Sequence, residues 1–97
     1  MTDQQITEAA LGRFDPNETR EARLKRMKIR SWRRGIKEMD LILGPYADAE
    51  LADMDDAALD LFDALLLEND HDLYQWVSGQ TVAPERFSDL IRVLSRR

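Results

Sequence analysis

Apolar residues recur every three or four positions along most of this chain, which is the spacing of one face of an α-helix. Between Thr19 and Gly35 the residues are good helix formers without an intervening glycine or proline. A partly apolar face in this segment consists of Leu24, Met27, Ile29 and Trp32. The pattern predicts a helix over residues 18–33, which Gly35 ends by adopting the left-handed conformation that glycine reaches without strain.

A second apolar series follows this glycine and contains a Gly-Pro pair. Its members are Ile36, Met39, Ile42, Leu43 and Tyr46. Because Pro45 lacks a backbone N–H and crowds the preceding turn, we expect the second helix to stop or kink near residue 44.

The second half of the chain predicts three further helices. Asp55 is placed to cap a helix over 56–68, with Asp60 and Asp63 facing water. The buried side of this helix would be Leu59, Phe62, Leu65 and Leu66. Asn69 or Asp70 would cap the next helix, over 71–78. That short helix carries Leu73, Trp76 and Val77 and ends at Gly79.

The last helix has the clearest apolar stripe. Pro84 suits its first turn, where a missing N–H costs nothing. The stripe consists of Phe87, Leu90, Ile91 and Leu94. No segment alternates as a strand does, so the sequence predicts an all-α fold, a compact bundle of about five short helices. We expect a single domain over residues 18–97, preceded by a flexible N-terminal extension over residues 1–17.

Charge is unevenly spread along the chain, whose formal net charge is −5. Residues 20–37 hold nine Lys and Arg, whereas residues 40–72 hold eleven Asp and Glu and no Lys or Arg. This separation favours oriented docking on a protein partner over adhesion to nucleic acid. A nucleic-acid-binding or adaptor module stays open as the alternative, because a basic helix face can contact phosphates.

Composition also limits the chemistry and the location of the chain. It has no cysteine, which excludes thiolate chemistry, and its single histidine, His71, has no second nitrogen or sulfur ligand for a metal site. No stretch approaches the roughly 20 uncharged apolar residues of a membrane span, and no targeting peptide is visible. We therefore expect a cytoplasmic protein without membrane insertion.

Two blocks of the sequence resemble a known family. The first block reads Trp32-Arg33-Arg34-Gly35-Ile36-Lys37-Glu38-Met39-Asp40. It is similar to the Arg-Gly-x-x-Glu signature of the succinate dehydrogenase flavinylation factors. The second block reads Phe62-x-x-Leu65-Leu66, followed by Asp70-x-Asp72-Leu73-Tyr74-x-Trp76. It is similar to the other characteristic segment of that family, although His71 stands where members often carry proline.

The resemblance implies a non-enzymatic assembly factor. Such a factor binds the flavoprotein subunit of succinate dehydrogenase and promotes covalent attachment of FAD to a histidine of that subunit. FAD then belongs to the client protein, and this chain binds no cofactor tightly. Whether fumarate reductase is a second client stays open. The implied partner-binding residues are Trp32, Arg33, Arg34, Gly35, Glu38 and Asp40, with a second partner-contact region at Asp70, Asp72, Tyr74 and Trp76.

Several of these positions also have a purely structural interpretation. Gly35 can serve as a helix cap, or it can let a partner backbone come close. Glu38 can pair with Arg34 one turn earlier, but such exposed pairs contribute only about 0.2–0.5 kcal/mol. Asp70 and Asp72 fall where helix capping already explains acidic residues, and no nucleophile accompanies them. We therefore expect no catalytic residue.

Overall fold

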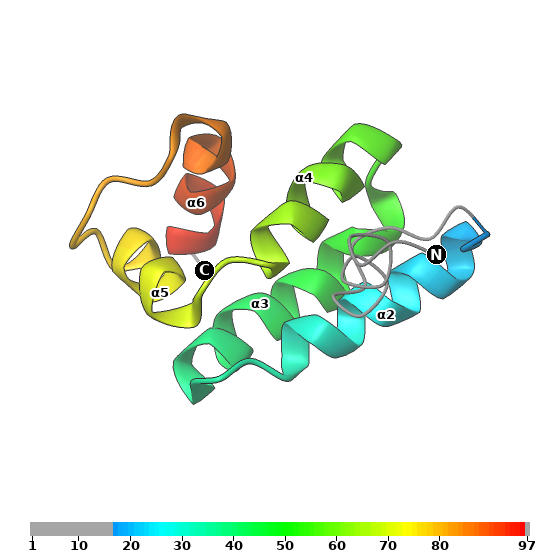
Figure 1. The fold of residues 1–97 in the computed structure, drawn as a ribbon, viewed down its shortest axis with the longest axis horizontal. Helices are drawn as coiled ribbons and strands as arrows, with labels where there is room; N and C mark the ends of the chain where they lie inside the picture. The colour runs from blue at the N-terminus through cyan, green and yellow to red at the C-terminus, as the bar shows by residue number, and fades with distance from the viewer. Residues whose placement is uncertain (1–16, 97) are drawn as a thin grey trace, which may run out of the picture.

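The computed structural model describes residues 17–96, and five α-helices make up most of this part of the chain. They are α2 (Arg20–Trp32), α3 (Lys37–Glu50), α4 (Asp56–Leu66), α5 (Asp70–Val77) and α6 (Ser88–Ser95), with two short 3-10 helices, η1 (Leu51–Asp53) and η2 (Glu85–Phe87). Helices α2 and α3 run antiparallel, and α5 and α6 lie together at one end (Figure 1). Residues 17–96 contain no strand, so the all-α prediction is confirmed. The predicted extension, apart from its last residue, lies outside the described residues.

Helix α2 begins close to its predicted start and ends slightly early. Oγ1 of Thr19 accepts a hydrogen bond of 3.1 Å from the backbone N–H of Ala22, which satisfies a donor left free in the first turn. The helix ends at Trp32, and within residues 17–96 only Gly79 has a positive φ, of 83°. Gly35 is therefore not left-handed, and its predicted role as the glycine cap of this helix is wrong.

Helix α3 continues through Pro45, so a stop near residue 44 is excluded. A proline in a helix interior costs about 3 kcal/mol. Burying a large apolar side chain contributes about 1.5–3 kcal/mol. Because α3 buries Met39 and Leu43 before the proline and Tyr46 after it, packing against the rest of the domain outweighs the lost hydrogen bond.

Side-chain caps begin α4 and α5 as predicted. Asp55 accepts a hydrogen bond from the N–H of Ala58 at 2.8 Å, and Asn69 accepts one from the N–H of His71 at the same distance. Each cap satisfies an N–H that has no partner inside its own helix. Local sequence signals therefore suffice to start both helices.

The end of α5 is the place where a glycine must be left-handed. The N–H of Gly79 bonds to the carbonyl of Trp76 at 3.2 Å, and that of Gln80 bonds to the carbonyl of Gln75 at 2.8 Å. These two bonds form the Schellman arrangement, which needs a positive φ at the residue after the cap. The predicted stop at Gly79 is confirmed.

The last helix begins later than predicted. Pro84 precedes η2, and α6 starts only at Ser88, so the proline does not lie in the first turn of α6. The apolar stripe itself is confirmed, because Phe87, Ile91 and Leu94 are buried and Leu90 packs against the core.

All five helices contribute to a single core. Two aromatic contacts contribute to it. Tyr46 of α3 and Phe62 of α4 have ring centroids 5.5 Å apart, and Trp76 of α5 and Phe87 of η2 have ring centroids 6.1 Å apart. The buried apolar residues are Met27, Met39, Leu43, Tyr46, Ala47, Leu51, Leu59, Phe62, Leu65, Leu66, Leu73, Phe87, Ile91 and Leu94.

Asp63 is the main exception to the predicted burial pattern. It is 4% exposed, so the prediction that it faces water is wrong, whereas Asp60 is exposed as predicted. The Asp63 carboxylate accepts hydrogen bonds of 2.8 and 2.9 Å from Arg26 and one of 3.3 Å from Arg23. Arg26 also donates to Glu18 at 2.8 and 3.1 Å. A buried carboxylate is tolerated because the two arginines of α2 neutralise it.

The same ion pairs keep Arg26 charged. Its hydrogen bond with Asp63 is the largest cause that raises the pKa of the guanidinium above the ordinary value, and Glu18 adds to it, whereas burial acts in the opposite direction. Because the net direction is upward, Arg26 stays protonated over the whole pH range in which proteins fold.

Candidate functional site

Residues 33–36, which we call the signature turn, join α2 to α3 beside the start of α5 (Figure 1). The guanidinium of Arg34 holds this turn in place. It donates hydrogen bonds to the carbonyls of Leu66 at 2.7 Å and Glu68 at 3.0 Å, and its Nε donates to Asp70 Oδ1 at 2.7 Å. The two carbonyls lie at and just beyond the end of α4, where they lack helical partners.

Backbone amides of the signature turn are held by two carboxylates. The N–H of Arg34 donates to Asp40 Oδ1 at 2.5 Å, and the N–H of Gly35 donates to Asp70 Oδ2. Arg34 and Asp70 have side chains only 8% and 15% exposed. Three predicted partner-binding residues, Arg34, Asp40 and Asp70, therefore have hydrogen-bond partners within the domain.

Other side chains of the first block point into solvent. Arg33 and Glu38 are exposed, and neither side chain has a hydrogen bond or ion pair with another described residue. The pair between Glu38 and Arg34 does not form, because Asp70 and two backbone carbonyls occupy the guanidinium. A stabilising ion pair therefore does not explain why position 38 is a glutamate.

Trp32 is partly exposed beside the signature turn. Its ring lies over Gly44, where an added Cβ would come within 2.3 Å of the indole, and its Nε1 donates to Asp48 at 3.2 Å. The indole therefore has a fixed position while 39% of Trp32 stays open to solvent. A rigid, half-exposed aromatic residue is typical of interface hot spots.

Two exposed apolar residues near Trp32 were not predicted as site residues. Ile29 lies one turn before Trp32 on α2, and Leu41 lies one turn before Gly44 on α3. The prediction that Ile29 belongs to the apolar face of α2 is wrong, because Leu24 and Met27 define the inward side of this helix and Ile29 is 47% exposed. Helical spacing relative to Leu24 and Met27 was the signal for its exposure. No comparable signal marked Leu41.

The second predicted contact region contains both exposed and partly buried side chains. Asp72 and Tyr74 are exposed, as is His71, whereas Trp76 is half-buried against Phe87. Together with the internal bonds of Asp70, this leaves Asp72 and Tyr74 as the members of the region that a partner can reach.

The basic run 20–37 is less free than its sequence indicates. Five of its nine basic residues lie within 3.9 Å of a carboxylate; they are Arg20, Arg23, Arg26, Lys28 and Arg34. The others, Lys25, Arg30, Arg33 and Lys37, form no ion pair with residues 17–96. Much of the basic run thus serves to neutralise the acidic segment that follows it.

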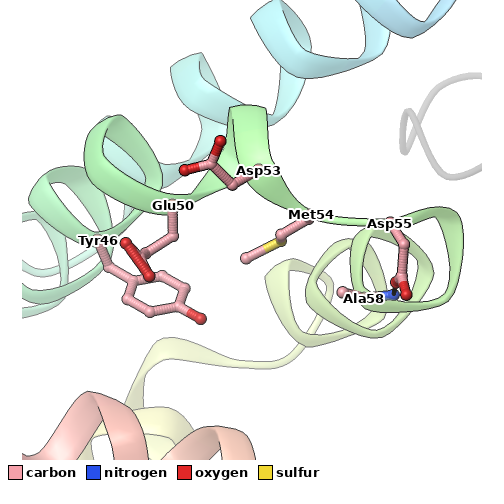
Figure 2. Close-up of a pocket in the computed structure, with 6 residues that line it drawn as sticks. All are labelled: Tyr46, Glu50, Asp53, Met54, Asp55 and Ala58. Atoms are coloured by element: carbon pink, nitrogen blue, oxygen red, sulfur yellow. Dashed lines mark hydrogen bonds between the residues drawn. The ribbon is translucent and has the colours of Figure 1, made fainter.

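A surface cavity of about 320 Å³ lies between the end of α3 and the start of α4. Figure 2 shows Tyr46 and Met54 on its walls, with three carboxylates around it. Its lining residues are Tyr46, Glu50, Asp53, Met54, Asp55 and Ala58. None of the residues predicted for the site contributes to it.

Two kinds of feature are absent from the part of the chain that the structure describes. Within residues 17–96, no group of three or more His, Asp or Glu side chains is arranged to hold a metal ion. No helix of this part of the chain has the length and apolar character needed to cross a membrane.

The geometry is that of a small five-helix domain with an internally anchored, solvent-exposed turn. Residues 25–97 match the family model described as the flavinator of succinate dehydrogenase, and the chain belongs to this family. The resemblance inferred from the two sequence blocks is confirmed.

Named relatives agree with this assignment. The protein called succinate dehydrogenase assembly factor 2, mitochondrial, of Schizosaccharomyces pombe is 40% identical over 81 residues, which cover 81% of this chain and 58% of the relative. The protein of the same name from Meyerozyma guilliermondii is 40% identical over 75 residues, covering 74% and 56%. That from Drosophila grimshawi is 32% identical over 84 residues, covering 84% and 57%.

This chain spans less than three fifths of the length of each of these three relatives. Their names place them in mitochondria, so they do not support the predicted cytoplasmic location, which stays a prediction.

Proposed function

We propose that this chain binds the flavoprotein subunit of succinate dehydrogenase and promotes the covalent attachment of FAD to it, without performing catalysis itself. Membership of the flavinator family and the names of the relatives support this function. The structural observation that carries it is the exposure of Arg33, on the signature turn, and of Glu38, in the first turn of α3, while Arg34 between them is bonded internally.

Such a turn is well suited to bind a protein partner. Because Arg34 and Asp70 already fix the turn, little conformational freedom is lost when a partner binds to it. Charge-assisted hydrogen bonds from Arg33 or to Glu38 are roughly twice as strong as neutral ones. Trp32, the last residue of α2, adds a partly exposed aromatic ring that packs over Gly44 of α3.

In this proposal FAD is a ligand of the client and not of this chain. The chain acts by holding the client in a conformation in which the flavin bond forms. Fumarate reductase, whose flavoprotein subunit would present similar chemistry, is an additional client to test.

A nucleic-acid-binding function fits the structure less well. Affinity for phosphates needs several unpaired cations on one face. In the described part of the chain, the ion pairs of Arg20, Arg23 and Arg26 with carboxylates already use a large part of the basic run. An adaptor function would differ from the proposed function only in the identity of the protein that is bound.

Deletion of the gene tests the proposal directly. The flavoprotein subunit should remain present but carry little covalent flavin, which is measured by flavin fluorescence of the denatured subunit in a gel. Expression of the wild-type chain from a plasmid should restore the signal. Normal covalent fluorescence in the deletion strain would refute the proposed function.

A further inference from the structure

One carboxylate from α5 holds the signature turn through two different groups. Oδ1 of Asp70 accepts from Arg34 Nε at 2.7 Å, and Oδ2 accepts from the backbone N–H of Gly35. Asp70 is not needed as the cap of its own helix, because the side chain of Asn69 caps α5. Both oxygens of Asp70 are therefore committed to a turn that lies about 35 residues earlier in the chain.

The same carboxylate explains why residue 35 is glycine. A Cβ atom at this position would lie 2.7 Å from Asp70 Oδ2, closer than real Cβ contacts allow. The Asp70 carboxylate cannot move away from residue 35 without losing its hydrogen bonds to Gly35 and Arg34. A left-handed backbone gives no reason for glycine here, since φ of Gly35 is not positive.

We propose that Asp70 is the positioning residue of the signature turn, and that residue 35 is glycine so that Asp70 can reach the backbone. This inference rests on the proposed function for its consequence, which is client binding. Ile36 stands at the N-cap of α3 without any side-chain cap, so the anchored turn sets where α3 begins. Glu38 follows Ile36 by two residues, so Asp70 determines the position of Glu38 toward the client. Asp70 itself does not contact the client.

Amide hydrogen exchange tests the positioning role without any client. In Asp70→Ala both acceptors of the turn are lost, so the Gly35 amide should exchange at least about tenfold faster than in the wild type. Asp89→Ala is the matched control, because Asp89 is also an acid in the first turn of a helix and also pairs with an arginine, Arg92. It should leave Gly35 exchange unchanged. Unchanged exchange at Gly35 in Asp70→Ala overturns the proposal.

A double-mutant cycle with the client tests the reason for the glycine. Affinity for purified flavoprotein subunit lacking covalent flavin is measured for Gly35→Ala, Asp70→Ala and the double variant. Each single variant should bind about tenfold more weakly. The double variant should bind no more weakly than Asp70→Ala, because the new methyl group then meets no carboxylate.

The alternative is that a client backbone packs against Gly35. The methyl group then acts independently of Asp70, and the two losses multiply to about a hundredfold. That result would overturn the proposed reason for the glycine. If the wild-type chain does not bind the flavoprotein subunit at all, the proposed function fails, while the exchange experiment still decides whether Asp70 positions the turn.

Discussion

Asp63 and Asp70 both accept hydrogen bonds from arginines of the basic run, yet they stabilise different parts of the molecule. Asp63 is a residue of α4 and accepts hydrogen bonds from the side chains of Arg23 and Arg26 of α2. Asp70 bonds to the side chain of Arg34 and also to the backbone of Gly35. The first cluster joins two helices, whereas the second determines the conformation of a turn that carries exposed residues.

This difference predicts how the two clusters respond to mutation. Loss of the Asp63 cluster should lower the stability of the whole domain, because it removes the buried carboxylate that two partly buried arginines share. Loss of the Asp70 cluster should alter the turn and cost less stability than loss of the Asp63 cluster. The following variants test this contrast, in order of decreasing expected effect on the free energy of unfolding.

Asp63→Ala should be the most destabilising of these variants. Removing one partner of a buried ion pair costs about 3–5 kcal/mol, and we expect the lower end because both arginines are partly exposed. Denaturation in urea measures the change. Asp60→Ala is the control: Asp60 also pairs with Arg23 but is exposed, so its loss should cost less than about 1 kcal/mol. Equal losses for the two variants would mean that burial of Asp63 has no energetic consequence.

Arg34→Lys should lower the free energy of unfolding by about 2 kcal/mol, despite keeping the charge. The planar guanidinium reaches the carbonyls of Leu66 and Glu68 and the carboxylate of Asp70 at the same time. A single ammonium group cannot match this geometry, so at least one acceptor loses its partner. Thermal and urea denaturation report the loss. Arg33→Lys, at the exposed neighbouring position, should stay within about 0.5 kcal/mol of the wild type.

Local signals account for the parts of the fold that the sequence predicted correctly. The caps at Asp55 and Asn69 and the stop at Gly79 depend on residues at most five positions apart, so they are readable from the sequence. The apolar stripes of α4 and α6 follow helical spacing in the same way.

The errors share a different cause, which is contact between distant residues. Asp63 fits a solvent-facing position of α4, but Arg26 reaches it from 37 residues away. Gly35 fits a helix cap by its position in the sequence, but its contact with Asp70 spans 35 residues. At the proposed site, the family signature indicated the turn between α2 and α3. It could not show that Arg34, Asp40 and Asp70 are bonded internally, because the helix arrangement decides that.

Gly44→Ala tests the fixed position of Trp32 and should cost about 1 kcal/mol. The added Cβ would lie within 2.6 Å of three ring atoms, so the indole must move away from α3. The strain from overpacking is about 1–3 kcal/mol, and the higher helix propensity of alanine offsets about 1 kcal/mol of it. In a Trp76→Phe background, Trp32 is the remaining tryptophan, and its emission should shift to longer wavelength as the ring becomes exposed. A more stable protein with unchanged emission would contradict this packing.

Glu38→Gln should have the smallest effect on stability, within about 0.5 kcal/mol, because Glu38 is exposed and has no partner among residues 17–96. Binding to the flavoprotein subunit and the yield of covalent flavin should nevertheless fall, since a charge-assisted bond to the client would be lost. Glu21→Gln is the matched control, because Glu21 is the second residue of α2 as Glu38 is the second residue of α3. Both variants therefore lose the same favourable interaction with a helix N-terminus. Only the Glu38 variant should lose binding. If the two variants give the same yield of covalent flavin on the flavoprotein subunit, Glu38 is not a client contact, whatever the family of the chain.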